Sequence, residues 1–118
     1  MQPLTPKEVK KVCEYTIAIV RRLGLSASFN YSVVFLSPGD LERISKGETV
    51  VEVEDGVYVD PRGLIIVRSD LLANIAVRKV MVGILSLASI ENFGEISMSL
   101  VNKLVNEYYD NVLVYLYR

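Results

Sequence analysis

One run of twenty residues, 71–90, constrains this chain more than any other part of its sequence. It reads LLANIAVRKVMVGILSLASI and is long enough to cross a bilayer. Ten of its residues are Leu, Ile or Val, each of which favours insertion by roughly 0.3 to 0.6 kcal/mol. Arg78 and Lys79, near the middle, oppose insertion by about 2.5 to 3.5 kcal/mol apiece. The summed free energy of insertion into a bilayer is therefore about zero or unfavourable. We expect this run to be a helix of a soluble protein.

On a helix, this run carries apolar side chains on two sides. The broader side is made of Leu72, Ala76, Val77, Val80, Gly83, Ile84 and Leu87. The second side is made of Leu71, Ile75, Val82 and Leu85. Both sides need cover, so the sequence predicts a sheet on one side and either another helix or a second copy of the chain on the other. A glycine in mid-helix, Gly83, indicates tight packing against a neighbour.

The amino-terminal segment 5–24 has the signals of an amphipathic surface helix. Thr5 and Glu8 have the spacing of a capping box, in which each side chain bonds the other residue's backbone amide. A shorter helix with similar signals is expected at 37–47. The single cysteine, Cys13, falls on the apolar stripe of the first helix, so we interpret it as a core residue and not as a nucleophile.

Strands are expected on both sides of the apolar run. Residues 29–36 carry no charge and are rich in β-branched and aromatic side chains, which predicts an interior strand. Residues 110–118, DNVLVYLYR, alternate apolar side chains on both faces and predict a terminal strand. Between the run and this strand, a stripe of apolar residues predicts a further helix at about 95–109.

A β-meander is expected at 48–68, because Asp55–Gly56 is a strong signal for a two-residue hairpin. This turn would pair Val53 with Tyr58 on one face. It would turn two acidic side chains, Glu52 and Glu54, toward water.

These patterns together predict a single α+β domain over residues 1–118, with a mostly antiparallel sheet of about five strands. The N-terminal amphipathic helix, the central apolar helix at about 70–90 and the helix at about 95–109 are expected mainly on one face. The chain is 51% hydrophobic, which excludes disorder, and its formal charge of -1 gives no overall attraction to phosphate or anionic lipid.

Composition also bears on the setting. One cysteine cannot form an internal disulfide, and the amino terminus lacks the pattern of a signal peptide, so a cytoplasmic location is expected. The chain has neither His nor Trp and a single Gln, and it is rich in Val and Ile, a composition that favours a heat-adapted source.

Catalytic chemistry finds little support. The absence of His removes the commonest general base and the usual ligand of transition metals, and we expect no catalytic residue, metal or cofactor. A small enzyme that uses carboxylates and Mg²⁺ or Ca²⁺ is a third, less favoured hypothesis. Its candidate ligands, which a solvated strand face explains better, are Glu48, Glu52, Glu54, Asp55 and Asp60.

The element order resembles, in outline, small zinc peptidases of the zincin type, whose metal-binding helix carries HExxH. At the matching place this chain has Arg78, Lys79, Val80, Met81 and Val82. The resemblance therefore implies no peptidase activity.

Two functions remain in view. The favoured one is a non-catalytic protein-interaction or self-association module, expected to be homodimeric, whose interface would include Leu71, Ile75, Val82, Leu85, Tyr108, Tyr109, Tyr115 and Tyr117. The alternative is an accessory or regulatory protein that binds nucleic acid through the basic face of its first helix, made of Lys7, Lys10, Lys11, Arg21 and Arg22.

Overall fold

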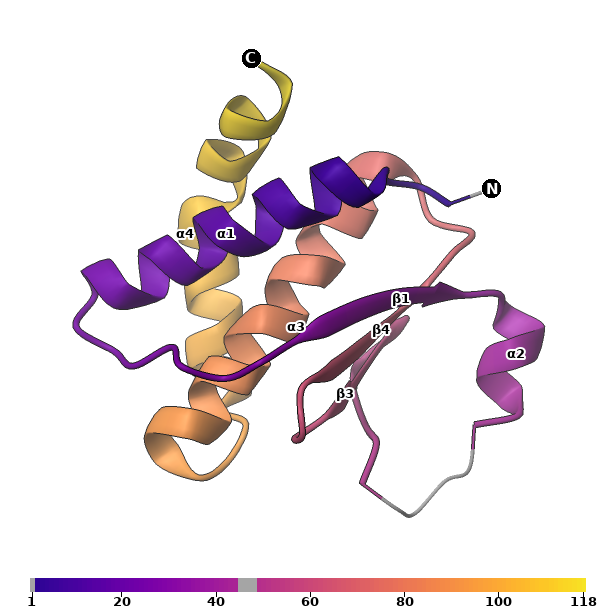
Figure 1. Ribbon diagram of the computed structural model, residues 1–118, viewed down its shortest axis with the longest axis horizontal. Helices are drawn as coiled ribbons and strands as arrows, with labels where there is room; N and C mark the ends of the chain where they lie inside the picture. Colours follow the sequence, from indigo (N-terminus) through magenta and orange to yellow (C-terminus); the bar gives the residue numbers. More distant parts are fainter. Residues whose placement is uncertain (1, 45–48) are drawn as a thin grey trace.

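The computed structural model describes residues 2–44 and 49–118, which form four helices and a four-stranded sheet (Figure 1). The helices are α1 (Pro6–Arg22), α2 (Pro38–Glu42), α3 (Ala73–Phe93) and α4 (Met98–Tyr117). The strands are β1 (Ser32–Leu36), β2 (Val51–Glu54), β3 (Val57–Asp60) and β4 (Leu64–Arg68). The predicted α+β class is confirmed. The helix predicted at 37–47 is shorter than expected, because α2 ends at Glu42 with Arg43 as its C-cap. Residues 45–47 of that prediction and Glu48 lie outside the described residues.

The sheet has the strand order β1-β4-β3-β2, with β1 parallel to β4 and the other two pairs antiparallel. The prediction of about five, mostly antiparallel strands is therefore wrong in number and in the direction of one pair. The reason lies in β4, whose Ile65, Ile66 and Val67 are all buried. A strand that is apolar on both faces needs a central position, and β1 supplies its second neighbour. The predicted interior strand at 29–36 is instead an edge strand.

The carboxyl-terminal segment is helical, so the predicted strand at 110–118 is wrong. Its alternating apolar residues also fit a helical stripe, in which Val112 and Leu116 are buried one turn apart. This stripe continues the one begun by Val101, Leu104 and Val105, and α4 runs on to Tyr117 instead of ending near residue 109. Packing against the rest of the molecule decides between two periods that the short sequence leaves open.

The β2–β3 hairpin forms at Asp55–Gly56, but its register differs from the prediction. Glu52 pairs with Tyr58 and Glu54 with Val57, so Val53 is left as a bulge and does not pair with Tyr58. The structure also corrects the expectation that Glu54 points to water. Its carboxylate accepts a hydrogen bond of 2.6 Å from Lys79 Nζ on α3.

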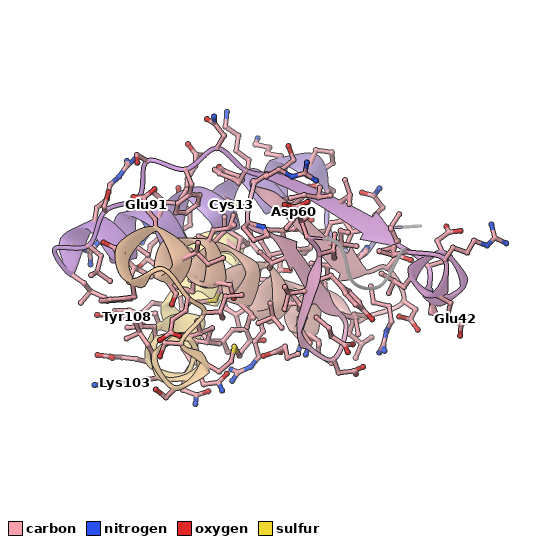
Figure 2. The ribbon with its side chains drawn as sticks, turned by 90° about the horizontal axis from the view of Figure 1, so that it is seen from below. Cys13, Glu42, Asp60, Glu91, Lys103 and Tyr108 are labelled. Carbon is pink, nitrogen blue, oxygen red and sulfur yellow. The ribbon has the colours of Figure 1, made fainter. Side chains whose placement is uncertain are left out.

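The central apolar helix is covered on two sides, as its sequence predicts. α3 packs directly on β3 and β4, and α1 and α4 pack on α3 (Figures 1 and 2). Twelve of its twenty-one residues are buried. By length and composition α3 would also fit a membrane, but 67% of its most apolar window is buried within the protein, as in a core helix.

Gly83 sets how closely α3 approaches the sheet. A Cβ atom at this position would overlap Ile65 Cγ2 of β4, and it would lie 3.1 Å from Cγ1 and Cδ1 of the same side chain. The tight packing predicted from this glycine is therefore a contact between the helix backbone and one isoleucine.

We expect Gly83→Ala to destabilise the protein even though alanine favours a helix by about 1 kcal/mol over glycine. Overpacking against Ile65 costs roughly 1 to 3 kcal/mol and outweighs that gain. Denaturant unfolding of the variant, of Ile65→Ala and of the double variant measures the coupling. Gly83→Ala should be neutral or stabilising once Ile65 is alanine. Gly39→Ala, which meets no atom closer than 4.0 Å, is the control. An equal loss in both backgrounds would contradict the packing argument.

Candidate protein-interaction site

Within the part of the chain that the structure describes, no strand lies along the outer edge of β1. Ser32 N–H donates to the Gly63 carbonyl at 2.8 Å, and the Leu36 carbonyl accepts from Ser69 N–H at 2.8 Å. These groups point toward β4, and successive residues of a strand alternate in direction. The N–H and C=O groups of Val33 and Phe35 therefore point away from β4, toward the free edge of the sheet.

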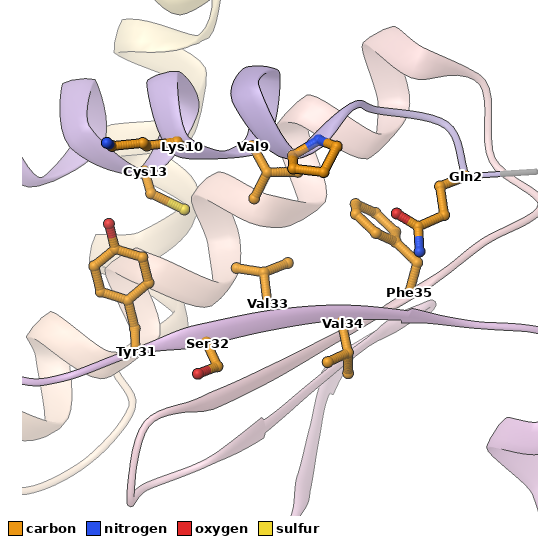
Figure 3. A pocket seen from close by; sticks show the side chains of 10 residues that line it. Gln2, Val9, Lys10, Cys13, Tyr31, Ser32, Val33, Val34 and Phe35 are labelled. Carbon is orange, nitrogen blue, oxygen red and sulfur yellow. The ribbon is translucent and has the colours of Figure 1, made fainter.

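A groove of about 530 Å³ lies between this edge and the first half of α1 (Figure 3). The side chains of Tyr31, Val33 and Phe35 point from the strand toward the helix, whereas Ser32 and Val34 point to the other face of the sheet (Figure 3). The residues that line the groove are Gln2, Pro6, Val9, Lys10, Cys13, Tyr31, Ser32, Val33, Val34 and Phe35. The surfaces that β1 and α1 turn toward the groove are thus mainly apolar, and the backbone edge of β1 forms one side of the groove.

The residues that line the groove carry little charge. Lys10 is the one charged side chain among the described residues that line it, and residues 24–36 carry no charge at all. The helix above contains five basic and two acidic side chains. The Cys13 thiol is buried beneath α1, and desolvation with a smaller contribution from Glu14 raises its pKa to about 12. Burial also raises the pKa of the Tyr31 hydroxyl. The groove suits apolar groups and offers no thiolate.

The opposite edge of the sheet, formed by β2, is protected against pairing with other chains, whereas the β1 edge is not. β2 has four residues, is interrupted by a bulge, and carries Glu52 and Glu54. Short length, bulges and charged side chains are the features by which edge strands avoid pairing with other chains. β1 has five regular residues without charge, proline or bulge. An unprotected edge beside an apolar groove marks a place where another chain can add.

The loop that leads into β1 is held by the end of α3. Ser28 donates to the Glu91 carboxylate from its backbone N–H and its hydroxyl, each at 3.0 Å. Asn92 Oδ1 accepts from Ser26 N–H at 2.9 Å, and Asn92 Nδ2 donates to the Ser26 carbonyl at 2.8 Å. Serine donors hold the pKa of the Glu91 carboxyl below its ordinary value. Figure 2 shows Glu91 beside this loop. These contacts give the groove a fixed wall, and no sequence pattern revealed them.

The structure places the interface residues predicted from the sequence in two settings. Val82 and Leu85 are buried within the chain. Because α4 packs on α3, the chain's own helix α4 covers this side of α3, where a second copy was the alternative. The others reach the surface to differing degrees: Leu71, Tyr108 and Tyr109 are half-buried, and Ile75, Tyr115 and Tyr117 are exposed. Tyr115 packs against Tyr15 of α1, with ring centroids 4.8 Å apart and the ring planes tilted by 39°, and the Tyr109 hydroxyl donates to the Asn74 carbonyl. Homodimerisation remains a prediction.

The basic residues of the nucleic-acid hypothesis all lie on α1. Lys7, Lys10, Arg21 and Arg22 are exposed and Lys11 is half-buried. Arg21 Nη2 donates to the Ala27 carbonyl at 2.7 Å, which uses part of that cation inside the molecule. Contact with nucleic acid remains a prediction.

Three carboxylates of the metal hypothesis, Glu54, Asp55 and Asp60, have protein partners. Asp60 is buried and accepts hydrogen bonds from Thr49 Oγ1 at 2.8 Å, Arg62 N–H at 2.9 Å and Arg62 Nη2 at 2.8 Å. Asp55 lies 3.5 Å from Arg68 Nη1. Within residues 2–44 and 49–118, no group of three or more His, Cys, Asp or Glu side chains could hold a metal ion.

The two cations at the position of the zincin motif also have structural partners. Lys79 pairs with Glu54, and Arg78 Nη2 donates to Asn106 Oδ1 of α4 while its guanidinium lies 5.6 Å from the centre of the Tyr109 ring. Both side chains tie α3 to its neighbours.

Comparison with protein-family models, with curated proteins and with solved structures returns no match. The assignment of function therefore depends on the geometry of the described residues.

We expect the Cys13 thiol to resist Ellman's reagent in the folded protein at pH 8, because its raised pKa leaves little thiolate and burial blocks access. In guanidinium chloride the same thiol should react fully within the time of mixing and reading. Stoichiometric reaction of the folded protein on that timescale would show that the groove exposes the sulfur.

We expect Asp60→Asn to lower the melting temperature at pH 7, because the hydrogen bonds to Arg62 and Thr49 depress the pKa of this carboxyl in the folded state. A depressed pKa stabilises the fold above the ordinary carboxyl pKa of 3.8, and this contribution fades as the pH falls below it. The difference from the wild type should therefore shrink between pH 5 and pH 2. Asp110→Asn, an exposed change on α4, is the control. A difference that stays constant with pH would contradict the linkage.

Proposed function

We propose that this chain is a non-catalytic protein-interaction module that binds an extended segment of another polypeptide as an additional strand beside β1. Strand addition uses main-chain hydrogen bonds for affinity and pockets for alternate side chains for specificity. Both elements are present here, in the outward N–H and C=O groups of Val33 and Phe35 and in the adjoining apolar groove.

The contrast between the two sheet edges is the observation that supports this proposal. A free and uncharged edge is a liability for a protein that does not use it, since it invites pairing between chains. The β2 edge carries several protective features, whereas β1 carries none. The rigid attachment of the preceding loop to Glu91 and Asn92 keeps the edge strand in place without a bound partner.

A second copy of the chain is a less favourable occupant of this edge. Antiparallel pairing of two β1 strands about a two-fold axis would place both helix layers on the same side of the joined sheet. The two α1 helices would then face each other, each with five basic and two acidic side chains. Like charges at an interface oppose association.

The test is a selection of random nine-residue peptides displayed on phage against the immobilised protein, with Val33→Lys and Val114→Lys in parallel. Lysine at position 33 enters the groove (Figure 3), whereas Val114 is exposed on α4 and is not among the residues that line the groove. We expect the wild type and Val114→Lys to enrich the same sequences and Val33→Lys to bind them at least about ten-fold more weakly, a change of about 1.4 kcal/mol.

Three results would overturn the proposal: no enrichment, equal binding by both lysine variants, or no slowing of amide exchange at Val33 and Phe35 in the wild type with bound peptide. The exchange measurement uses the unmodified chain, so it holds even where a variant folds poorly. Light scattering at micromolar concentration tests whether a second copy of the chain occupies the edge. A dimer that Val33→Lys dissociates would identify a second copy as the occupant.

A further inference from the structure

We infer that the groove selects a segment with two apolar residues at alternate positions, followed two positions further toward Tyr31 by an acidic residue. This inference rests on the proposed strand addition and names the class of its ligand. It joins three facts: the direction of the free backbone groups, the composition of the groove, and the position of its one charged lining residue.

The register follows from the pleat of the sheet. Residues directly opposite each other on paired strands project to the same face. Ligand residues opposite Val33 and Phe35 would therefore project toward α1, where Pro6 and Val9 line the groove. The ligand residue between them would project to the other face of the sheet, beside Val34. Only the first two positions meet the apolar groove, so only they need apolar side chains.

The charge preference arises one step further along the strand. The ligand residue beside Tyr31 also projects toward α1, and at this end of the groove the helix presents Lys10 next to Cys13 (Figure 3). Lys10 is exposed and lines the groove. Glu14, one turn further along α1, acts electrostatically on the Cys13 thiol and the Tyr31 hydroxyl, but it is not among the described residues that line the groove. A carboxylate at this ligand position would therefore meet the opposite charge of Lys10, whereas a lysine there would meet a like charge.

A phosphate backbone is a poorer match for the same surface. Nucleic-acid affinity depends on several cations that contact successive phosphates. The groove offers one lysine and a mainly apolar lining, and Arg21 at the far end of α1 bonds the Ala27 carbonyl. The geometry therefore favours an acidic peptide.

The test uses six synthetic heptapeptides with an amino-terminal fluorescein and an amidated carboxyl terminus, threonine at the remaining positions and valine at two alternate positions. The third alternate position is Glu, Gln or Lys. It follows the two valines in one set of three peptides and precedes them in the other set, because the ligand strand could run in either direction along β1. Fluorescence anisotropy measures binding to the wild type, Lys10→Glu, Val33→Lys and the control Lys103→Glu. Figure 2 shows Lys103 on α4, away from Cys13.

In one of the two sets we expect the Glu peptide to bind about two- to five-fold more tightly than the Gln peptide, and the Lys peptide to bind most weakly. Lys10→Glu should reverse this order, Lys103→Glu should leave it unchanged, and 0.5 M salt should reduce it. Nucleic acid serves as the competitor: a short duplex DNA should not displace the Glu peptide at 0.15 M salt.

The outcomes separate this inference from the proposed function. Equal binding of the three peptides in both sets, still abolished by Val33→Lys, overturns the charge preference and leaves strand addition standing. Failure of all six peptides, while the selected nine-residue peptides bind, has the same meaning. If Val33→Lys does not weaken peptide binding, both strand addition and the charge preference are overturned. Both are also overturned if the preference for the Glu peptide survives Lys10→Glu and duplex DNA displaces that peptide.

Discussion

The burial of α3 between the sheet and the other helices is the constraint on which this molecule depends. A fully buried Val, Leu or Ile contributes about 1.5 to 3 kcal/mol relative to an exposed one, and α3 has such residues on several sides. A helix this apolar needs β3 and β4 beneath it and α1 and α4 around it. Gly83 then sets the spacing, because its missing side chain is the space that Ile65 occupies.

This arrangement determines where a binding edge can exist. β4 lies directly under α3 and is apolar on both faces, so it takes a central place with β3 on one side and β1 on the other. β1 is left with one free edge, and α1 lies above that edge because it packs on α3. The groove is thus a consequence of helix packing. Its walls belong to α1 and β1, and the core is complete without close contact between these two elements.

Polar contacts give the site its rigidity. Glu91 and Asn92, near the end of the central helix, bond the backbone of the loop before β1, so the strand is positioned from the same helix that organises the core. The polar groups inside the core are satisfied locally. The Thr16 hydroxyl donates to the Val12 carbonyl and the Ser86 hydroxyl to the Val82 carbonyl, both at 2.7 Å. Buried hydroxyls bonded in this way do not disturb the apolar contacts around them.

The sequence by itself determined those features that depend on neighbours along the chain. Thr5 and Glu8 form the expected capping box, Asp55–Gly56 forms the expected turn, and the run at 71–90 becomes the two-sided core helix. The tertiary structure alone decided that residues 110–117 are helical, that β1 lies parallel to β4 at an edge, and that a groove opens beside it. Local propensity acts over a few residues. The place of a strand in a sheet, by contrast, depends on which distant surfaces lose the most contact with water when they meet.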